Sequence, residues 1–399
     1  MDLSRRSKVC IAHGALTNSK RPESFVKGVY PTHLISGKGS FVFDENNKKY
    51  LDFICGLGTN LLGYDFFIHK NLAYILSQGL CLSLGSDKEV EVAEEIKETF
   101  PAIKKLRFLK TGTEACSASI RIARAFTKKK LILSNGYHGW SDEFVSLTPP
   151  ANGIPHKYTD IVQFSDLEYV KKLKNITAAV IVEPVITDWS DERRAFLQEL
   201  RNICTENGIV LIFDEIITGF RWPKLSVSKA WGIDPDLLLL GKAIANGFPL
   251  SVVGGREDIM ESDYFVSSTF AGDRMALEAA KIVIKELKTK QIDKTMWENG
   301  EKLQARFNAL YPDLVTMTGY PTRGIFTARD EMTKALFFQE ACKAGILFGA
   351  SWFFNIHHID HIDQVIAISN SILSKIKNFE VKLEGALPMS PFAQKVRSL

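Results

Sequence analysis

The sequence predicts an α/β fold with a doubly wound, largely parallel sheet and a second, smaller α+β domain. Three observations support this prediction. The chain of 399 residues is long enough for one large domain and a smaller one. Strand-like and helix-like segments alternate from residue 106 to residue 255. The strand-like runs at 209–214 and 237–240 lack the polar alternation of a half-exposed strand, which is typical of buried parallel strands.

Before the alternating region, the pattern predicts an irregular terminus, a hairpin and a helix. Residues 1–22 show no regular period, so a flexible, loop-like segment is expected. Residues 40–44 and 49–54 alternate around a turn and predict a β-hairpin, and a glycine-rich turn around Leu57 follows. Residues 88–100 have helical spacing and end before a proline, which predicts a helix.

Within and after the alternating region, the elements follow in a regular order. The expected elements are a strand at 106–109 with a helix up to Phe126, strands at 131–134 and 178–182, a helix around 196–203, and a long helix at 275–290. Helix and strand signals mix from residue 297 to residue 377, which indicates the smaller domain, and residues 385–399 have no usable pattern.

Two of the buried strands end next to side chains with useful chemistry. The first ends on Asp214, and the second is followed, one glycine later, by Lys242. Ligands of open α/β sheets bind beyond the carboxyl ends of the strands, so we expect this acid and this amine in one site. Pyridoxal phosphate chemistry requires a lysine that forms a Schiff base with the aldehyde and an acid that pairs with the pyridinium nitrogen. The sequence therefore predicts pyridoxal 5′-phosphate as a cofactor.

Two other interpretations apply to Lys242. A lysine after a strand is most often a solvated surface residue. The pair Gly241-Lys242 also resembles part of a nucleotide-binding P-loop. That motif needs a glycine where Asp236 stands and a serine or threonine where Ala243 stands, so the P-loop is rejected.

The turn Thr111-Gly112-Thr113 is the candidate seat for the cofactor phosphate. Thr111 and Glu114 have the spacing of a capping box at the start of the following helix. Backbone amides and a hydroxyl at a helix N-terminus favour an anion, although many helices begin in this way. After the next strand comes Tyr137, whose ring could stack on a planar cofactor or pack in the core.

The composition favours an ordinary globular enzyme. Apolar residues make up 45% and charged residues 24% of the chain, and the formal net charge is +4 with scattered basic residues, so we expect no binding of nucleic acid. No apolar run approaches the ~18 residues that span a bilayer. The six cysteines form no CxxC pair, which favours reduced thiols in the cytoplasm over disulfides or a zinc site.

Six stretches of the chain carry a resemblance to a known family. They are KTGTEACSASIRIARAFT, NGYHGWSDEF, VIVEPV, IFDEIITGFR, LLLLGKAIANGFPL and SSTFAGDRMAL. In order and spacing they resemble the class III (fold-type I) pyridoxal-phosphate aminotransferases, most closely the glutamate-1-semialdehyde 2,1-aminomutase branch. The resemblance implies a seven-stranded, mostly parallel sheet in the large domain and a homodimer with shared active sites.

The resemblance also implies roles for individual residues around the cofactor ring. Lys242 would bind the aldehyde and move the proton during the reaction, and Asp214 would bond the pyridine nitrogen. Ile216 and Tyr137 would pack on opposite faces of the ring. Glu183 matches a family acid near the cofactor.

The remaining matches concern the phosphate, a second subunit and one histidine. Gly112 and Thr113, after Thr111, would hold the phosphate. Thr269 would reach the phosphate of the neighbouring subunit. His138 matches a family histidine for which a structural role is an equally good interpretation.

At the substrate end, the match is to an N-terminal segment and one turn. Ser19 and Arg21 resemble residues of the family that help to bind substrate, although the arginine arrives one residue early. We expect residues 1–50 to cover the pocket and join the small domain, 51–285 to form the large cofactor-binding domain, and 286–399 to form the small domain.

Three departures from the aminomutase pattern concern the selection of substrate. Leu57, in the expected substrate pocket, stands where the aminomutase has a tryptophan, Asp188 stands in place of an asparagine, and Phe354 stands in place of its gating acid. The cofactor positions are intact. We therefore expect a transaminase that moves an amino group from a small-molecule amino donor to a carbonyl acceptor other than glutamate semialdehyde.

A sugar-like or polyhydroxylated acceptor is one hypothesis for this transaminase. It depends on Trp140, Trp352 and Phe353 as an aromatic pocket wall, and core packing is the competing interpretation of each. The spacing of His357 and His361 invites a metal site. The metalloprotease motif needs a glutamate where His358 stands, and histidines at helix starts are common, so we expect no metal.

Three alternatives to the transaminase stay open. The chain could be an aminomutase that moves an amino group within one molecule, or it could catalyse another pyridoxal phosphate reaction such as racemisation. It could also be a non-catalytic dimeric scaffold that retains the fold. The intact Lys242, Asp214 and phosphate turn argue against the scaffold.

Overall fold

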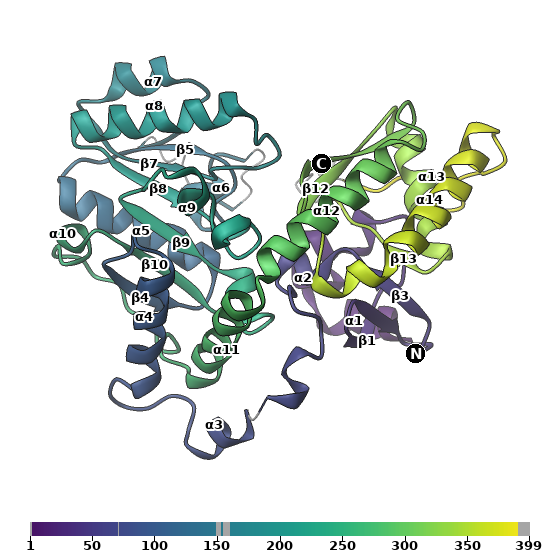
Figure 1. The fold of residues 1–399 in the computed structure, drawn as a ribbon, viewed down its shortest axis with the longest axis horizontal. Helices are drawn as coiled ribbons and strands as arrows, with labels where there is room; N and C mark the ends of the chain where they lie inside the picture. Colours follow the sequence, from purple (N-terminus) through teal and green to yellow (C-terminus); the bar gives the residue numbers. More distant parts are fainter. Residues whose placement is uncertain (1, 71, 149–152, 155–159, 390–399) are drawn as a thin grey trace. The chain divides into compact units, whose positions relative to one another are not determined.

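The computed structural model describes residues 2–70, 72–148, 153–154 and 160–389 (Figure 1). The chain divides into two compact units: Phe67–Lys294, and Met1–Phe66 together with Thr295–Leu399. The limits of functional domains at 51–285 and 286–399 stay a prediction. The last ten residues of the predicted small domain, 390–399, lie outside the described residues.

The unit Phe67–Lys294 is built around a seven-stranded sheet with the order β4-β10-β9-β8-β7-β5-β6. Its strands are β4 (Lys105–Leu109), β5 (Leu131–Asn135), β6 (Ile161–Gln163), β7 (Thr177–Val182), β8 (Val210–Asp214), β9 (Leu237–Leu240) and β10 (Ser251–Gly255). β10 runs antiparallel to both neighbours, whereas β9, β8, β7, β5 and β6 pair in parallel. The predicted mostly parallel, seven-stranded sheet is confirmed.

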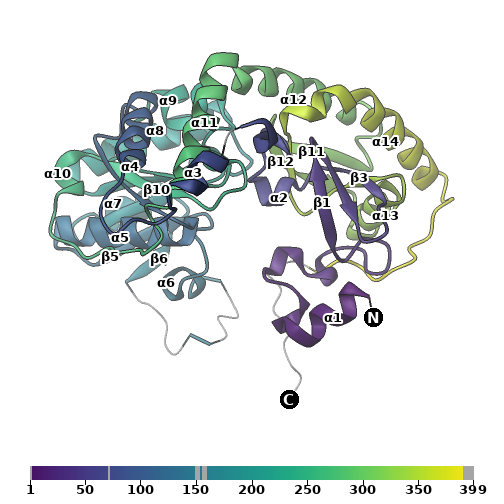
Figure 2. The same ribbon diagram turned by 90° about the horizontal axis from the view of Figure 1, so that it is seen from below.

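Helices lie on both faces of this sheet, as the full burial of β7, β8 and β9 requires. The helices of this unit are α3 (Ala73–Ser77), α4 (Asp87–Thr99), α5 (Gly112–Thr127), α6 (Asp142–Val145), α7 (Leu167–Leu173), α8 (Asp191–Asn207), α9 (Val227–Trp231), α10 (Glu257–Met260) and α11 (Arg274–Lys290). Figure 2 shows α5 on one side of the sheet and α8 and α9 on the other, as right-handed crossovers dictate.

The second unit combines two small sheets with helices. One sheet has the order β1-β2-β3-β13, and the other has the order β11-β12-β14. The strands are β1 (Leu34–Lys38), β2 (Phe41–Asp44), β3 (Lys49–Asp52), β11 (Val315–Tyr320), β12 (Arg323–Ala328), β13 (Ile346–Leu347) and β14 (Trp352–Phe353). The helices are α1 (Leu3–Cys10), α2 (Cys55–Gly58), α13 (Glu331–Lys343) and α14 (Ile362–Lys377), and α12 (Ile292–Asn308) enters this unit from the other.

Short 3₁₀ helices complete the described chain. They are η1 (Ala12–Gly14), η2 (Asn18–Lys20), η3 (Pro22–Ser24), η4 (Phe66–His69), η5 (Pro223–Leu225), η6 (Lys242–Ala245) and η7 (Ile356–His361). The predicted hairpin is confirmed as the antiparallel pair of β2 and β3. The sequence pattern did not reveal β1 or the two-residue β13, which pairs in parallel with β3.

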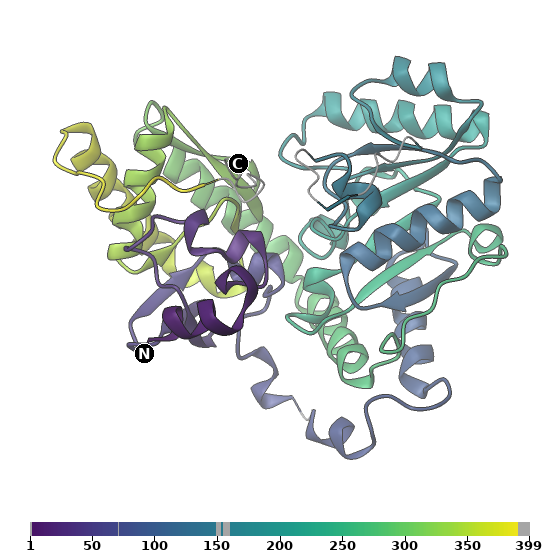
Figure 3. The same ribbon diagram turned by 180° about the vertical axis from the view of Figure 1, so that it is seen from behind.

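The prediction of a loop-like chain over residues 1–22 is wrong. Figure 3 shows this segment as a series of short helices, and the first of them is α1. Asp2 begins α1 because its side chain accepts the backbone N–H of Arg5 at 2.7 Å. Of the residues in α1, Ser7 is the buried one. No large apolar side chain of the helix is buried, so hydrophobic burial gives no reason to expect a helix here.

A buried carboxylate fixes the chain just after β8. Glu215 is fully buried, and its carboxylate accepts the backbone N–H groups of Val227 and Ser228, both at 2.8 Å, and the hydroxyl of Thr218 at 2.9 Å. Burial raises the pKa of Glu215 to about 7, although these hydrogen bonds oppose the shift. Glu215 thereby ties the start of α9 to the segment that follows β8.

This raised pKa predicts a pH dependence of stability. Between pH 4.5 and about 7 the folded chain holds a proton on Glu215 that the unfolded chain releases, so the free energy of unfolding falls as the pH rises through that window. The loss amounts to about 3 kcal/mol for a shift of this size. Denaturant unfolding of the wild type and of Glu215→Gln at several pH values measures it. We expect the variant to lack this slope, and equal slopes in the two proteins would contradict the argument.

Candidate active site

The candidate active site lies at the carboxyl ends of β8 and β9. Asp214 is the last residue of β8 and is paired with Leu239 in the parallel register of the two strands. Gly241 and Lys242 follow β9 directly. The register therefore brings the predicted acid and the predicted amine to the same edge of the sheet.

The backbone is constrained where Lys242 enters η6. Lys242 has a φ of 41°, in the left-handed region, which costs a residue with a Cβ about 1–2 kcal/mol. Such conformations cluster at functional sites. The preceding Gly241 is extended, and a Cβ there would lie 3.2 Å from Cγ2 of Ile216. The glycine thus lets the chain pass close to Ile216, and the Lys242 side chain is half-buried.

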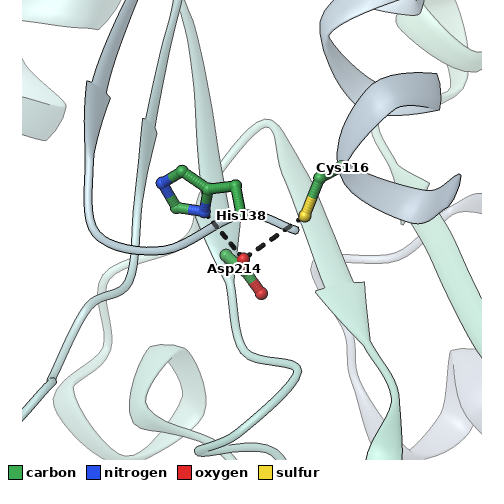
Figure 4. Close-up of side chains that lie close together, drawn as sticks. All are labelled: Cys116, His138 and Asp214. Carbon is green, nitrogen blue, oxygen red and sulfur yellow. Dashed lines mark hydrogen bonds and ion pairs between the residues drawn. The ribbon is translucent and has the colours of Figure 1, made fainter. Parts of the chain in front are cut away.

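Figure 4 shows the carboxylate of Asp214 between His138 and Cys116. Oδ2 of Asp214 lies 2.8 Å from Nδ1 of His138 and accepts the thiol of Cys116 at 3.3 Å. Oδ1 accepts the backbone N–H of Ile216 at 3.1 Å. Asp214, His138 and Cys116 are all buried. Burial, reinforced by the charge of Asp214, raises the pKa of the Cys116 thiol well above its usual value, so the thiol is a hydrogen-bond donor.

The turn Thr111-Gly112-Thr113, the candidate phosphate site, has the predicted capping box. Oγ1 of Thr111 accepts the N–H of Glu114 at 3.2 Å, and Oε2 of Glu114 accepts the N–H of Thr111 at 2.8 Å, so this prediction is confirmed. A Cβ on Gly112 would lie 2.9 Å from Cδ1 of Ile216. Gly139 has a φ of 102°, and a Cβ there would overlap the side chain of Thr113. Two glycines therefore allow Ile216 and the loop after β5 to pack closely against the start of α5.

A second buried acid organises the loop after β5. Oε1 of Glu183, which follows β7, accepts the backbone N–H of Tyr137 at 2.7 Å. Arg193 donates to the backbone oxygens of Glu183 and Pro184, both at 2.9 Å. The side chain of Tyr137 is 51% exposed, and burial of its remaining surface, with Cys116 and Glu183 nearby, raises its pKa. Glu183 thus holds the loop that carries Tyr137 and His138.

Four further predicted site residues are not among the hydrogen-bond partners of Asp214, His138 or Cys116 in the described part of the chain. Thr269 is exposed on the same unit. Ser19, Arg21 and Leu57 belong to the other unit, so their substrate contacts stay a prediction. Nε of Arg21 is buried and has no hydrogen-bond partner among the described residues. The backbone of Leu57, like that of Lys242, is in the left-handed region, with a φ of 63°.

The residues at which the chain departs from the aminomutase have structural contacts. Asp188 accepts the backbone N–H of Ser190 at 3.0 Å just before α8. Hydrogen bonds from the side chain of Ser190 and from this N–H lower the pKa of Asp188. Phe354, Trp352 and Phe353 are buried in their unit, whereas Trp140 is 74% exposed. The aromatic side chains Trp352 and Phe353 therefore pack in the core.

The histidine cluster near η7 contacts backbone and aromatic groups. Nε2 of His357 lies 3.2 Å from the backbone oxygen of Leu62, and Nδ1 of His358 accepts the N–H of Asn355 at 3.0 Å. The ring of His361 contacts that of Phe41 edge-on. Among the described residues, the group with metal-ligand spacing is instead Cys116, His138 and Asp214, whose ligand atoms lie within 4.8 Å of one another and already share hydrogen bonds.

Comparison with known proteins now identifies the family. The sequence model of the class-III aminotransferases matches residues 27–353. The chain belongs to the class III aminotransferases. It is therefore a pyridoxal-phosphate-dependent enzyme. In the part of the chain that the structure describes, no helix combines the length and the apolar character needed to cross a membrane.

Two curated relatives show that membership of class III does not by itself decide between an aminomutase and an aminotransferase. The glutamate-1-semialdehyde 2,1-aminomutase of Nitrosopumilus maritimus (strain SCM1) is 34% identical over 327 residues, which cover 75% of this chain and 76% of that protein. The 3-aminobutyryl-CoA aminotransferase of Cloacimonas acidaminovorans (strain Evry) is 32% identical over 327 residues, covering 77% and 78%. An aminomutase and an aminotransferase are thus about equally similar to this class III enzyme.

A solved structure supports the same fold. The FumI protein of Sphingopyxis sp. MTA144, determined with pyridoxal phosphate as its internal aldimine, superposes with a TM-score of 0.86 at 21% identity, covering 97% of this chain and 98% of that one. This likeness confirms the predicted fold class, a fold-type I transferase with a large and a small domain.

The residues of the class III site fit pyridoxal phosphate. The start of α5 has no side chain at Gly112 and offers backbone N–H groups to an anion. The buried Asp214 suits a cationic ring nitrogen, and Lys242 supplies an amine at the same edge of the sheet. The roles of the individual residues stay predictions.

The close approach of Gly139 to Thr113 predicts that a methyl group added at Gly139 lowers both the stability of the fold and the affinity for the cofactor. We expect Gly139→Ala to destabilise the protein by about 2–4 kcal/mol and to weaken the binding of pyridoxal phosphate, because the new Cβ displaces Thr113. Gly208→Ala is the matched control, since Gly208 is also left-handed, with a φ of 62°, but has open space around it. Unfolding curves and cofactor titration of the two variants measure the difference, and equal effects would contradict the steric explanation.

Proposed function

We propose that this enzyme is an aminotransferase that moves an amino group from a small-molecule amino donor to a carbonyl acceptor. The observation that carries the proposal is the parallel register of β8 and β9, with Asp214 ending one strand and Lys242 following the other. The burial and hydrogen bonding of Asp214 are what an acid needs to pair with a ring cation.

Each side chain has a separate task in this proposal. Pyridoxal phosphate, when bound, supplies an aldehyde that captures amines and a ring that accepts electron density. Nζ of Lys242 would hold the cofactor through its aldehyde carbon and, as a free amine, would take the proton from the donor Cα and deliver it to that same cofactor carbon. The carboxylate of Asp214 would keep a proton on the ring nitrogen. Gly112 and Thr113 would bind the phosphate, and Tyr137 and Ile216 would pack against the ring.

We also propose a homodimer in which Thr269 of one protomer reaches the phosphate site of its partner. Phe265 and Phe270, on either side of Thr269, are 80% and 61% exposed. Leu82 and Leu84 of the same unit are also exposed and alternate along the chain. Large exposed apolar side chains of this kind favour contact with another protein surface.

An aminomutase is the second candidate, because a relative with that activity is 34% identical. Leu57 and the buried Phe354, in place of a tryptophan and an acid, favour the aminotransferase. The sugar-like acceptor stays a hypothesis, now supported by Trp140 alone of its three aromatic residues, since Trp352 and Phe353 pack in the core.

Isotope labelling distinguishes the two candidates. The purified holoenzyme is incubated with a panel of ¹⁵N-labelled amino donors and unlabelled carbonyl acceptors, and the products are analysed by mass spectrometry. An aminotransferase places the label in the acceptor product. Turnover of glutamate-1-semialdehyde without any donor, with its own nitrogen retained, would instead identify an aminomutase.

The role of Lys242 predicts the largest loss of rate. We expect Lys242→Ala to lower kcat by at least about 10⁴-fold, because both the bond to the aldehyde and the proton transfer are removed. Lys104→Ala, which changes an exposed lysine before β4, serves as the control and should retain the wild-type rate. Turnover of an accepted donor–acceptor pair is the measurement, and a Lys242→Ala variant with appreciable activity would contradict the assignment.

The role of Asp214 predicts a loss of kcat without a comparable loss of bound cofactor. We expect Asp214→Asn to lower kcat by about 10²–10³-fold while retaining most of the bound pyridoxal phosphate, since the amide keeps the shape but not the charge. Cofactor content and kcat are measured on the same preparation. Normal kcat in this variant would show that the ring nitrogen needs no anionic partner.

A further inference from the structure

We infer that Cys116 is a positioning residue for Asp214: its thiol donates a hydrogen bond that fixes the orientation of the carboxylate and favours its ionised form toward the cofactor ring. This inference deepens the proposed role of Asp214 and rests on it. None of the roles that the sequence predicts includes this cysteine.

The geometry brings donors from three separate elements to one carboxylate (Figure 4). Cys116 lies in the second turn of α5, and its Sγ is 3.3 Å from Oδ2 of Asp214. His138, in the loop after β5, contacts the same oxygen at 2.8 Å. Ile216, just after β8, donates its backbone N–H to Oδ1 at 3.1 Å. Rotation of the carboxylate would break contacts on both oxygens, so its orientation is determined.

Because Cys116 and Asp214 are buried, the loss of any one hydrogen bond to the Asp214 carboxylate has a large energetic effect. Cys116 is completely inaccessible and Asp214 is 4% exposed, so water cannot replace a missing hydrogen bond. A hydrogen bond to the charged form of an acid favours that form. Burial and the charge of Asp214 raise the pKa of the Cys116 thiol, so the proton stays on sulfur, where it can be donated. The thiol is for the same reason a poor nucleophile.

Two other interpretations of Cys116 give different expectations. As plain packing, it would be one member of the apolar cluster around α5 and β8, and an apolar residue of similar size would serve equally well. As a metal ligand with His138 and Asp214, it would bind zinc in stoichiometric amounts. The mutual hydrogen bonds of the three side chains favour the positioning role over both.

Infrared spectroscopy of the holoenzyme tests the hydrogen bond itself. The S–H stretching band of Cys116 is identified by its loss in Cys116→Val. Cys204, a buried cysteine of α8, serves as the reference, and its band is identified by its loss in Cys204→Val. We expect the Cys116 band at lower frequency than the Cys204 band and expect it to shift in Asp214→Asn. Bands at equal frequency, unmoved in Asp214→Asn, would overturn the inference.

Kinetics and the state of the ring test the consequence. We expect Cys116→Val to lower kcat by about 3–10-fold with little change in KM, and expect Cys116→Ser, which restores a donor, to recover most of the rate. The ¹⁵N NMR shift of ring-labelled pyridoxal phosphate should move toward the unprotonated value in Cys116→Val and back in Cys116→Ser. Cys204→Val should change neither quantity. Cys116→Ala provides a second donor-free variant if the valine does not fold.

Each remaining outcome has one meaning. Wild-type kcat and ¹⁵N shift in both Cys116→Val and Cys116→Ala would overturn the inference in favour of packing, and stoichiometric zinc in the purified protein would overturn it in favour of a metal site. Failure of the proposed function is separate, because it appears as an active Lys242→Ala or a normal Asp214→Asn while the infrared comparison is unaffected.

Discussion

The candidate site depends on one carboxylate held out of water at the end of a central strand. Asp214 is buried among donors from α5, from the loop after β5 and from the turn after β8. A carboxylate in this position is stable only when its oxygens are hydrogen-bonded. Three segments that are distant in sequence must therefore meet at the same point. The parallel sheet makes this possible, because it delivers their ends to one edge.

The sequence predicted the elements that have a strong local signal. The apolar runs of β7, β8 and β9 and the capping box at Thr111 and Glu114 are visible in the sequence because burial and capping select residue types. Asp214 and Lys242 were found for the same reason, since each follows such a run. These two residues and the phosphate turn carry most of the candidate site.

Features that depend on tertiary contacts left no such signal. The hydrogen bond from Cys116 to Asp214 joins residues 98 positions apart, and the cysteine looks like any small apolar residue of a helix. Its place early in α5, directly after a strand of the same sheet, is the one hint that it faces the strand ends. α1 was missed because a cap at Asp2, and not an apolar face, defines it. Trp352 and Phe353 pack in the core, which composition cannot distinguish from a pocket wall.

The pairing of β13 with β3 has a consequence for folding during synthesis on the ribosome. Leu51 and Ile346 are partners in one small sheet although nearly three hundred residues separate them. The unit Phe67–Lys294 is continuous in sequence, whereas β3 cannot acquire its partner β13 until residues 346–347 have been synthesised. Until then the edge of β3 that β13 covers stays unpaired, and an unpaired strand edge can pair with the wrong chain.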